Sequence, residues 1–229
     1  MIFGVNIVYL LILVAVSLGF ILGVRALQKA VLSELSRTLY EENDPGRYAS
    51  MLNSRYLFLV LRRGTVALLR LDGALFAASA DAVWQACAVL DSAKLKQEER
   101  LNWYQKALSF AVMQADEQHA KDYLDRIVSF LERESNEELK AIRAEAGQLY
   151  GVYMEKNTGL ISELEETAAG CDGARLGVVL YRLAKLYHFA GDEAGAARRL
   201  KKAVVHLRNS PWLDVAERAL LDPSVLDVE

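Results

Sequence analysis

The expected fold is decided by the stretch LYRLAKLYHFAGDEAGAARRLKKA (Leu180–Ala203). Apolar residues recur at every third or fourth position over Leu180–Tyr187, which is the period of an amphipathic α-helix. Gly191 and Asp192 interrupt the period as a tight turn does, and the period resumes over Ala196–Ala203. Because two helices joined by so short a turn must pack antiparallel, the stretch predicts a helical hairpin.

The composition extends this helical prediction to most of the chain. Only three of the 229 residues are proline, and none lies between Gly46 and Ser210. That interval is rich in Ala, Leu, Glu, Lys and Arg, which are good helix formers. All-β folds need frequent turn residues and disordered chains contain few apolar residues, so both classes are excluded.

The same stretch resembles the tetratricopeptide-repeat (TPR) family. Leu183-Ala184, Tyr187 and Gly191-Asp192 match the family's Leu-small pair, its aromatic position and its turn, in that order. Small residues suit positions where the two helices cross closely, and larger residues fill the space between neighbouring units. The residues expected to pack the repeats are Ala120, Leu124, Leu183, Ala184, Tyr187, Ala196, Leu200 and Ala203.

Comparable starting points upstream predict further repeats at about the 34-residue period of the family. A charged insertion at about 135–142 lengthens one interval, and Asn157-Thr158 stands where one turn would hold Gly-Asp. The resemblance therefore implies an all-α protein containing an α-solenoid of antiparallel helix pairs, either a short TPR variant or a related solenoid. The expected repeats are 67–100, 101–134, 143–176 and 177–210.

The first 24 residues predict a transmembrane helix. Met1–Val24 contains no charged side chain, and about 22 residues at 1.5 Å each give roughly 33 Å of helix, enough to cross the hydrocarbon core. A signal peptide carries basic residues before its apolar run, whereas Arg25 follows this one. We therefore expect residues 2–24 to span the membrane, in preference to a cleaved signal peptide or a buried core helix.

Charge and small residues suggest how this span is oriented and packed. Arg25, Lys29 and Arg37 follow it, and by the positive-inside tendency they predict a single-pass protein with its C-terminal domain in the cytoplasm. Gly19 and Gly23 form a small-xxx-small pair through which two spans would pack as a homodimer.

The remaining segments are expected to be mostly helical. A juxtamembrane helix and linker cover 25–44, a leading helix covers 45–66, and a capping helix with a loose acidic tail covers 211–229. Tyr56–Leu71 fits either helices on both sides of Gly64 or a β-hairpin. Helices are favoured because an isolated hairpin is poorly stable in water.

The sequence contains no pattern that indicates catalysis or metal binding. It has no phosphate-binding Gly-rich loop, no HExxH motif and no nucleophile elbow, and His119, His188 and His206 lie far apart. Cys87 and Cys171 are isolated and suit small buried hydrophobes, although a bridge between them stays open. A net charge of −3 lacks the basic footprint of nucleic-acid binders. We therefore expect no enzyme, no cofactor, no metal and no nucleic-acid partner.

The TPR resemblance implies binding of a protein or peptide partner in a concave groove lined by the first helix of each pair. Arg182, Lys185 and His188 would receive an acidic peptide through charge-assisted hydrogen bonds. The expected function is a membrane-tethered scaffold or adaptor, and the alternative is an extracytoplasmic TPR chaperone-like accessory of the protein secretion machinery. The expected groove residues are Asn102, Gln105, Lys106, Ser109, Met113, Val178, Tyr181, Arg182, Lys185, His188 and Phe189.

Overall fold

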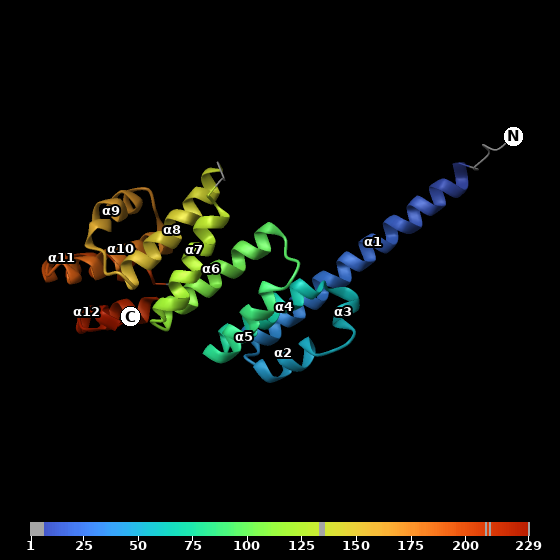
Figure 1. The fold of residues 1–229 in the computed structure, drawn as a ribbon, viewed down its shortest axis with the longest axis horizontal. Helices are drawn as coiled ribbons and strands as arrows, with labels where there is room; N and C mark the ends of the chain where they lie inside the picture. The colour runs from blue at the N-terminus through green and yellow to red at the C-terminus, as the bar shows by residue number, and fades with distance from the viewer. Residues whose placement is uncertain (1–6, 133–135, 209, 211, 229) are drawn as a thin grey trace. The chain divides into compact units, whose positions relative to one another are not determined.

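The chain is all-helical in the computed structural model (Figure 1). The structure describes residues 7–132, 136–208, 210 and 212–228, and these residues contain helices and no strand. The all-α prediction is confirmed. Residues 1–6 of the predicted span, Ser135 of the charged insertion and Pro211 before the predicted capping helix lie outside the described residues.

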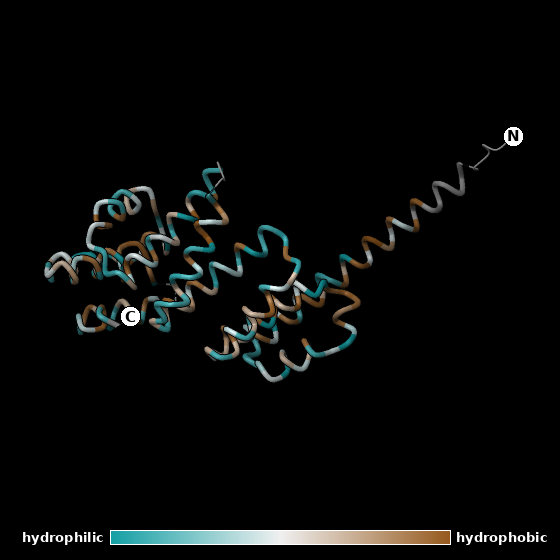
Figure 2. The backbone as a smooth tube through the Cα atoms, viewed as in Figure 1, coloured by the Kyte–Doolittle hydropathy of each residue, from teal (hydrophilic) through white to brown (hydrophobic). Residues whose placement is uncertain are grey.

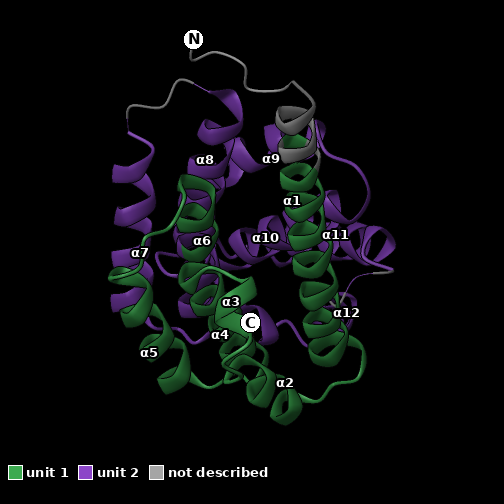
Figure 3. Ribbon diagram, turned by 90° about the vertical axis from the view of Figure 1, so that its right-hand side faces the viewer, with its two compact units in different colours: residues 1–103 green, residues 104–229 purple. Residues whose placement is uncertain are grey.

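The chain divides into two compact units, Met1–Trp103 and Tyr104–Glu229 (Figure 3). The boundary falls within helix α6 (Gln97–Met113). Before α6, the described part of unit 1 contains six elements. They are α1 (Ile7–Ser36), the π-helix η1 (Arg37–Glu41), α2 (Pro45–Leu52), α3 (Leu57–Val60), α4 (Arg63–Phe76) and α5 (Ala80–Asp91).

One N-terminal helix is long and apolar enough to cross a membrane. By length and composition, the described helical stretch Val16–Glu41 meets this criterion, and none of its most apolar window is buried. Figure 2 shows the apolar residues along α1 in brown. Two other kinds of helix meet the same criterion. One is the core helix of a soluble protein, which is mostly buried, and the other is a signal sequence near the N-terminus. A Cβ added at Gly19 or Gly23 would meet no atom within 4 Å, so both positions lie in open space. The homodimer through these two glycines stays a prediction.

The C-terminal end of α1 belongs to the core of unit 1. Leu35 and Leu39 are fully buried and cluster with Tyr48 and Leu52 of α2. The amide of Gln28 donates a hydrogen bond of 2.8 Å to the backbone carbonyl of Val60. The predicted juxtamembrane helix is therefore part of the packed unit rather than a separate stalk.

The segment Tyr56–Leu71 is helical, so the β-hairpin alternative is wrong. It contains α3 and the first turns of α4, and the predicted leading helix 45–66 is divided between α2, α3 and the start of α4. Gly64 lies inside α4, where an added Cβ would come within 2.8 Å of Leu95 Cδ2 and 3.1 Å of the carbonyl oxygen of Lys94. A glycine here permits the close approach of the segment that follows α5.

Unit 2 is built from the rest of α6 and eight further elements. They are α7 (Glu117–Phe130), α8 (Glu137–Tyr153), the 3₁₀ helix η2 (Thr158–Leu160), α9 (Ile161–Ala169), α10 (Gly173–Phe189), α11 (Glu193–His206), α12 (Leu213–Leu221) and α13 (Val225–Val228).

The helices α10 and α11 form the antiparallel hairpin that Leu180–Ala203 predicted. Near the start of α10, a Cβ added to Gly177 would lie 2.6 Å from Leu207 Cγ, just beyond the end of α11. At the other end, a Cβ added to Gly195 would lie 2.8 Å from Tyr187 Cδ1. Gly191 provides the turn with a positive φ of 78°, and the Asp192 carboxylate caps α11 by accepting the Gly195 N–H at 2.8 Å.

Most of the predicted repeat-packing residues are buried. Leu124 and Tyr187 are half-buried, whereas the following are buried: Ala120, Leu183, Ala184, Ala196, Leu200 and Ala203.

The C-terminal tail is not loose as the sequence suggested. Its residues Val225–Val228 form α13, and the Leu226 side chain is fully buried in the core of unit 2. The tail looked loose because it is short, acidic and follows Pro223, while its burial depends on a pocket that only the folded helices provide.

Candidate partner-binding site

Unit 2 contains a cavity of about 700 Å³, which we call the unit 2 cavity. Four helices contribute to it, and its volume lies within the range typical of ligand sites. Its wall is mostly apolar with a few polar side chains. The lining residues are Gln105, Leu108, Ser109, Val112 and Met113 of α6, Glu145, Ala146, Leu149 and Tyr153 of α8, Arg182 of α10, and Trp212, Val215 and Arg218 at α12.

Helical spacing explains why these side chains share one wall. On α8, Glu145, Leu149 and Tyr153 are four residues apart and therefore lie on one face. On α6, Gln105, Ser109 and Met113 repeat the same spacing. Each helix thus presents one strip of side chains to the cavity.

Arg182 is the most unusual residue of this wall. Only 8% of its side chain is exposed, and its Nη1 donates a hydrogen bond of 2.7 Å to Glu145 Oε1. Its Nε is buried and has no hydrogen-bond partner within the described part of the chain. A buried N–H without an acceptor is unfavourable, so the hydrogen bonding of the Arg182 guanidinium is incompletely satisfied by the described residues.

Tyr153 lies beside this guanidinium. Burial raises the pKa of the Tyr153 hydroxyl above its ordinary value, and the charge and hydrogen bonding of Arg182 only partly offset this effect. Tyr153 is therefore a neutral phenol at physiological pH and contributes a polar edge to an apolar wall.

The charges on the lining residues favour an acidic ligand. Arg182 and Arg218 are positive and Glu145 is negative, which leaves an excess of one positive charge. Arg218 is exposed and pairs with Asp214 of its own helix at 3.3 Å. A carboxylate is the group that a guanidinium binds with the best geometry.

The predicted groove residues are divided between different surroundings. Gln105, Ser109, Met113 and Arg182 line the unit 2 cavity together. Tyr181 is buried with its ring 6.0 Å from that of Trp212, whereas Asn102 is exposed and belongs to unit 1. Lys106 and Val178 are half-buried and do not line the cavity.

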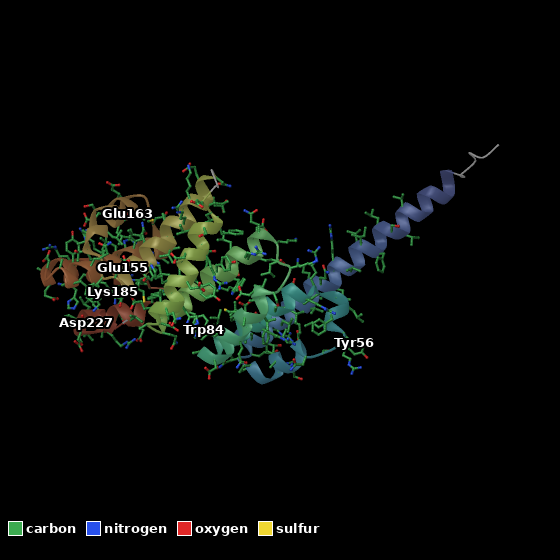
Figure 4. The ribbon with its side chains drawn as sticks, viewed as in Figure 1. Tyr56, Trp84, Glu155, Glu163, Lys185 and Asp227 are labelled. Carbon is green, nitrogen blue, oxygen red and sulfur yellow. The ribbon has the colours of Figure 1, made fainter. Side chains whose placement is uncertain are left out.

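Lys185, His188 and Phe189 lie toward the C-terminal end of α10, where the C-terminal segment of the chain contacts Lys185 and His188. Lys185 is almost completely buried, and its Nζ donates to the backbone carbonyl of Leu226. His188 Nε2 lies 3.4 Å from Asp227 Oδ1 (Lys185 and Asp227 are labelled in Figure 4). The expectation of one open basic cluster of Arg182, Lys185 and His188 is therefore wrong, because Lys185 has no open surface.

Sequence reasoning missed the contributions of α8 and α12 to the cavity. The four-residue spacing of Glu145, Leu149 and Tyr153 shows that they share a face, but not which helix that face meets. Trp212 and Val215 lie in a segment that looked like a cap. Only tertiary packing joins these residues to Arg182.

A smaller hollow of about 430 Å³ lies in unit 1, and it offers less chemistry. Small residues such as Ala67, Ala74 and Ala86 make much of its wall. Its charged residue, Arg70, is exposed and bonds Asn53 at 3.3 Å. The unit 2 cavity is the better candidate because one of its charged residues, Arg182, is buried.

Neither a metal centre nor a disulfide accompanies these sites. The described residues contain no cluster of three His, Cys, Asp or Glu side chains able to hold a metal ion. Cys87 is buried beside Trp103, whose Nε1 donates to its Sγ at 3.3 Å, and Cys171 is half-buried. Neither cysteine forms a disulfide in the described structure.

Comparison with known proteins does not assign the chain to a family. No family model, no curated protein and no solved structure matches it. The TPR resemblance therefore rests on the residues quoted above.

Proposed function

We propose that this protein is a membrane-anchored, TPR-like scaffold whose unit 2 cavity binds an apolar, carboxylate-bearing segment of a protein partner. The observation that carries the proposal is the buried Arg182, with an N–H that lacks an acceptor among the described residues, in the wall of a 700 Å³ apolar cavity.

The order of helices along the chain supports a TPR-like solenoid, because two helices fall near each expected repeat: α4 and α5, α6 and α7, α8 and α9, and α10 and α11. Of these, α4 packs against α5 and α10 packs against α11. Ala184 and Ala196, where the family places small residues, are almost completely buried. In such arrays each pair buries its apolar face against its neighbours, which leaves a long inner surface for partners.

The chemistry of the cavity favours a peptide segment with one acidic residue. Strips from α6 and α8 provide an apolar groove of the kind that accepts an amphipathic helix or extended peptide. The guanidinium of Arg182 would form a charge-assisted bond with the acid, which fixes the position of the segment along the groove.

Tethering explains how a modest intrinsic affinity suffices for this role. Residues 2–24 would hold the domain at the membrane, where its effective concentration toward membrane partners is raised. Arg25, Lys29 and Arg37 favour a cytoplasmic domain. The extracytoplasmic accessory of secretion remains the alternative and differs in this orientation.

A photocrosslinking experiment tests partner binding. A benzophenone amino acid replaces Met113, which lines the cavity and is 74% exposed, or Val205, which is exposed on α11 outside it. In native membranes we expect a defined protein adduct from position 113 that Arg182→Met abolishes, with the crosslinked peptide containing an acidic residue. Equal adducts from both positions, or adducts indifferent to Arg182→Met, would contradict the proposal.

A labelling experiment tests the orientation. Leu221 is 87% exposed, so Leu221→Cys in a Cys171→Ser background provides one reactive thiol while Cys87 stays buried. For a cytoplasmic domain, an impermeant maleimide labels this thiol only after the cells are permeabilised. Labelling of intact cells would establish the extracytoplasmic alternative. Mass spectrometry of the intact protein shows whether residues 1–24 are retained, as an anchor requires.

A further inference from the structure

The C-terminal segment 223–228 occupies a site on α10 and α12. It contains α13, which contacts both of these helices. The Leu226 side chain is fully buried in the same apolar cluster as Leu186 of α10 and Ala219 of α12. The segment thus inserts one aliphatic side chain into the folded unit.

Lys185 forms the polar part of this site. Its ammonium group is buried, which is unfavourable unless the charge is compensated. The Leu226 carbonyl accepts a hydrogen bond from Nζ, and the Tyr153 and Phe189 ring centroids lie 5.0 and 5.5 Å from Nζ. A main-chain acceptor and two aromatic faces therefore surround the cation.

The following residue of the segment adds a charge contact. Asp227 Oδ1 lies 3.4 Å from His188 Nε2, while Glu193 Oε1 lies 2.7 Å from His188 Nδ1. Asp227 itself is exposed, so this contact lies at the rim of the site. An aliphatic residue followed directly by an acidic residue is thus the pattern that the site accepts.

The segment can leave this site without unfolding α12. Residues 221–224 are exposed and connect α12 to α13. Ser224 donates hydrogen bonds to Asp222 Oδ1 within this connection, through Oγ at 2.7 Å and through N at 3.0 Å. A helix of four residues has no stability of its own, so α13 depends on its contacts with α10 and α12.

We propose that residues 223–228 are an intramolecular ligand, which occupies a peptide site on α10 that also fits a partner segment with an aliphatic residue followed by an acid. Release of the segment exposes Lys185. Because Tyr153 borders both Lys185 and the unit 2 cavity, release also extends that cavity along α10. The role of a partner rests on the proposed function, whereas the occupation of the site by this chain's own segment does not.

Covalent connection determines how strongly a free peptide competes. A short flexible connection gives the attached segment an effective concentration on the order of 1 mM. A free copy at about 10 µM is therefore outcompeted about a hundredfold in the intact chain. Binding of the free copy becomes measurable once the attached copy is expelled.

A fluorescein-labelled peptide with the sequence of residues 222–229 tests the proposal by fluorescence anisotropy on the full chain in detergent micelles. Leu226→Asp expels the attached segment, and Leu221→Asp is the matched control because Leu221 is already exposed. We expect saturable binding to the Leu226→Asp chain and none to the wild type or to Leu221→Asp. Adding Lys185→Met to Leu226→Asp should weaken binding at least tenfold, as should replacing the leucine of the peptide that corresponds to Leu226 with alanine.

Two results would overturn the proposal. One is a Leu226→Asp chain that retains its helical circular dichroism but does not bind the peptide, and the other is equal binding by the wild type. If Leu226→Asp does not fold, hydrogen exchange of the wild type decides the matter. The amides of 225–228 should exchange at least a hundredfold faster than those of α10, and equally slow exchange would show that the segment does not leave. Failure of crosslinking from Met113 would reject the proposed partner site but leave this result unaffected.

Discussion

Arg182 and Glu145 form an ion pair of 2.7 Å between α10 and α8 in which only the acid reaches water. The Arg182 side chain is 8% exposed and that of Glu145 is 46% exposed. The two partners therefore do not depend on the pair equally. Without Arg182, Glu145 regains its hydration, whereas without Glu145 a charged guanidinium remains buried with its Nε also lacking an acceptor in the described structure.

This difference predicts opposite consequences for two substitutions. Glu145→Ala should lower the free energy of unfolding by about 2 kcal/mol, the scale of a hydrogen bond to a charged group. Arg182→Met replaces the buried cation by an apolar side chain of similar length. This substitution should change the free energy of unfolding by less than about 1 kcal/mol. Chemical denaturation of the full chain in micelles, followed by circular dichroism, measures both values. An Arg182→Met chain less stable than Glu145→Ala would contradict this account of the pair.

A second prediction concerns the crossing of α10 and α11. A Cβ at Gly177 would lie 2.6 and 2.7 Å from Leu207 Cγ and Cδ2, and 3.2 Å from His206 Cβ, so the helices would have to separate. Gly177→Ala should therefore destabilise the chain by about 1–3 kcal/mol, the usual effect of overpacking. Thermal unfolding measures this loss.

Gly147→Ala provides the matched control. Gly147 lies inside α8, and a Cβ there would meet no atom within 4 Å. This substitution should stabilise the chain by up to about 1 kcal/mol, because alanine is the better helix former. If both substitutions destabilise equally, the close crossing is not the cause.

A third prediction is a pH dependence at the start of α7. Asp116 caps this helix by accepting the His119 N–H at 3.1 Å, and His119 Nδ1 lies 2.6 Å from Asp116 Oδ2. Although burial acts to raise the pKa of Asp116, the hydrogen bonds and charge of His119 lower it below its ordinary value. The folded chain therefore binds this proton more weakly than the unfolded chain does. The carboxylate contributes stability above the unfolded pKa, near 4, and this contribution is lost as the pH falls through the lowered folded pKa.

Asp116→Asn keeps a capping oxygen but removes this titration. The difference in melting temperature between the wild type and Asp116→Asn should decrease as the pH falls from about 6 to about 3. Asp125→Asn, at an exposed position of the same helix, should leave the pH dependence of the wild type unchanged. A difference between wild type and Asp116→Asn that is constant with pH would show that the charge at position 116 does not contribute.

The sequence predicted local structure far better than it predicted the site. The period of Leu180–Ala203 and its Gly-Asp turn were sufficient for the α10–α11 hairpin, because helix period and turn geometry are properties of neighbouring residues. The unit 2 cavity depends instead on which faces of α6, α8, α10 and α12 meet. No local pattern links Glu145 or Trp212 to Arg182, so the sequence alone indicated the α6 and α10 residues but not the α8 and α12 ones.

The burial of Lys185 shows the same limit for a charged residue. A lysine beside an arginine-containing stretch usually lies on a solvated face. Here a leucine 41 residues later in the chain covers it and supplies a backbone carbonyl. Because backbone acceptors are present at every residue, no side-chain pattern could have identified this contact.

The last prediction concerns the packing of the C-terminal end of α1 against the rest of unit 1. Leu35 of α1 and Leu39 of η1 are fully buried, whereas Leu32 of α1 is 37% exposed. Leu35→Ala or Leu39→Ala removes buried methyl groups and should destabilise unit 1 by about 2–5 kcal/mol. Hydrogen exchange of α2 and α4 in the full chain reads out this unit specifically and should become correspondingly faster. Leu32→Ala should have a smaller effect, since more than a third of Leu32 is already exposed. For the same reason, a chain beginning at Pro45 lacks part of the core of unit 1, and its α2 should exchange faster than in a chain beginning at Val31. Equal exchange in those two shortened chains would show that the end of α1 does not stabilise the rest of unit 1.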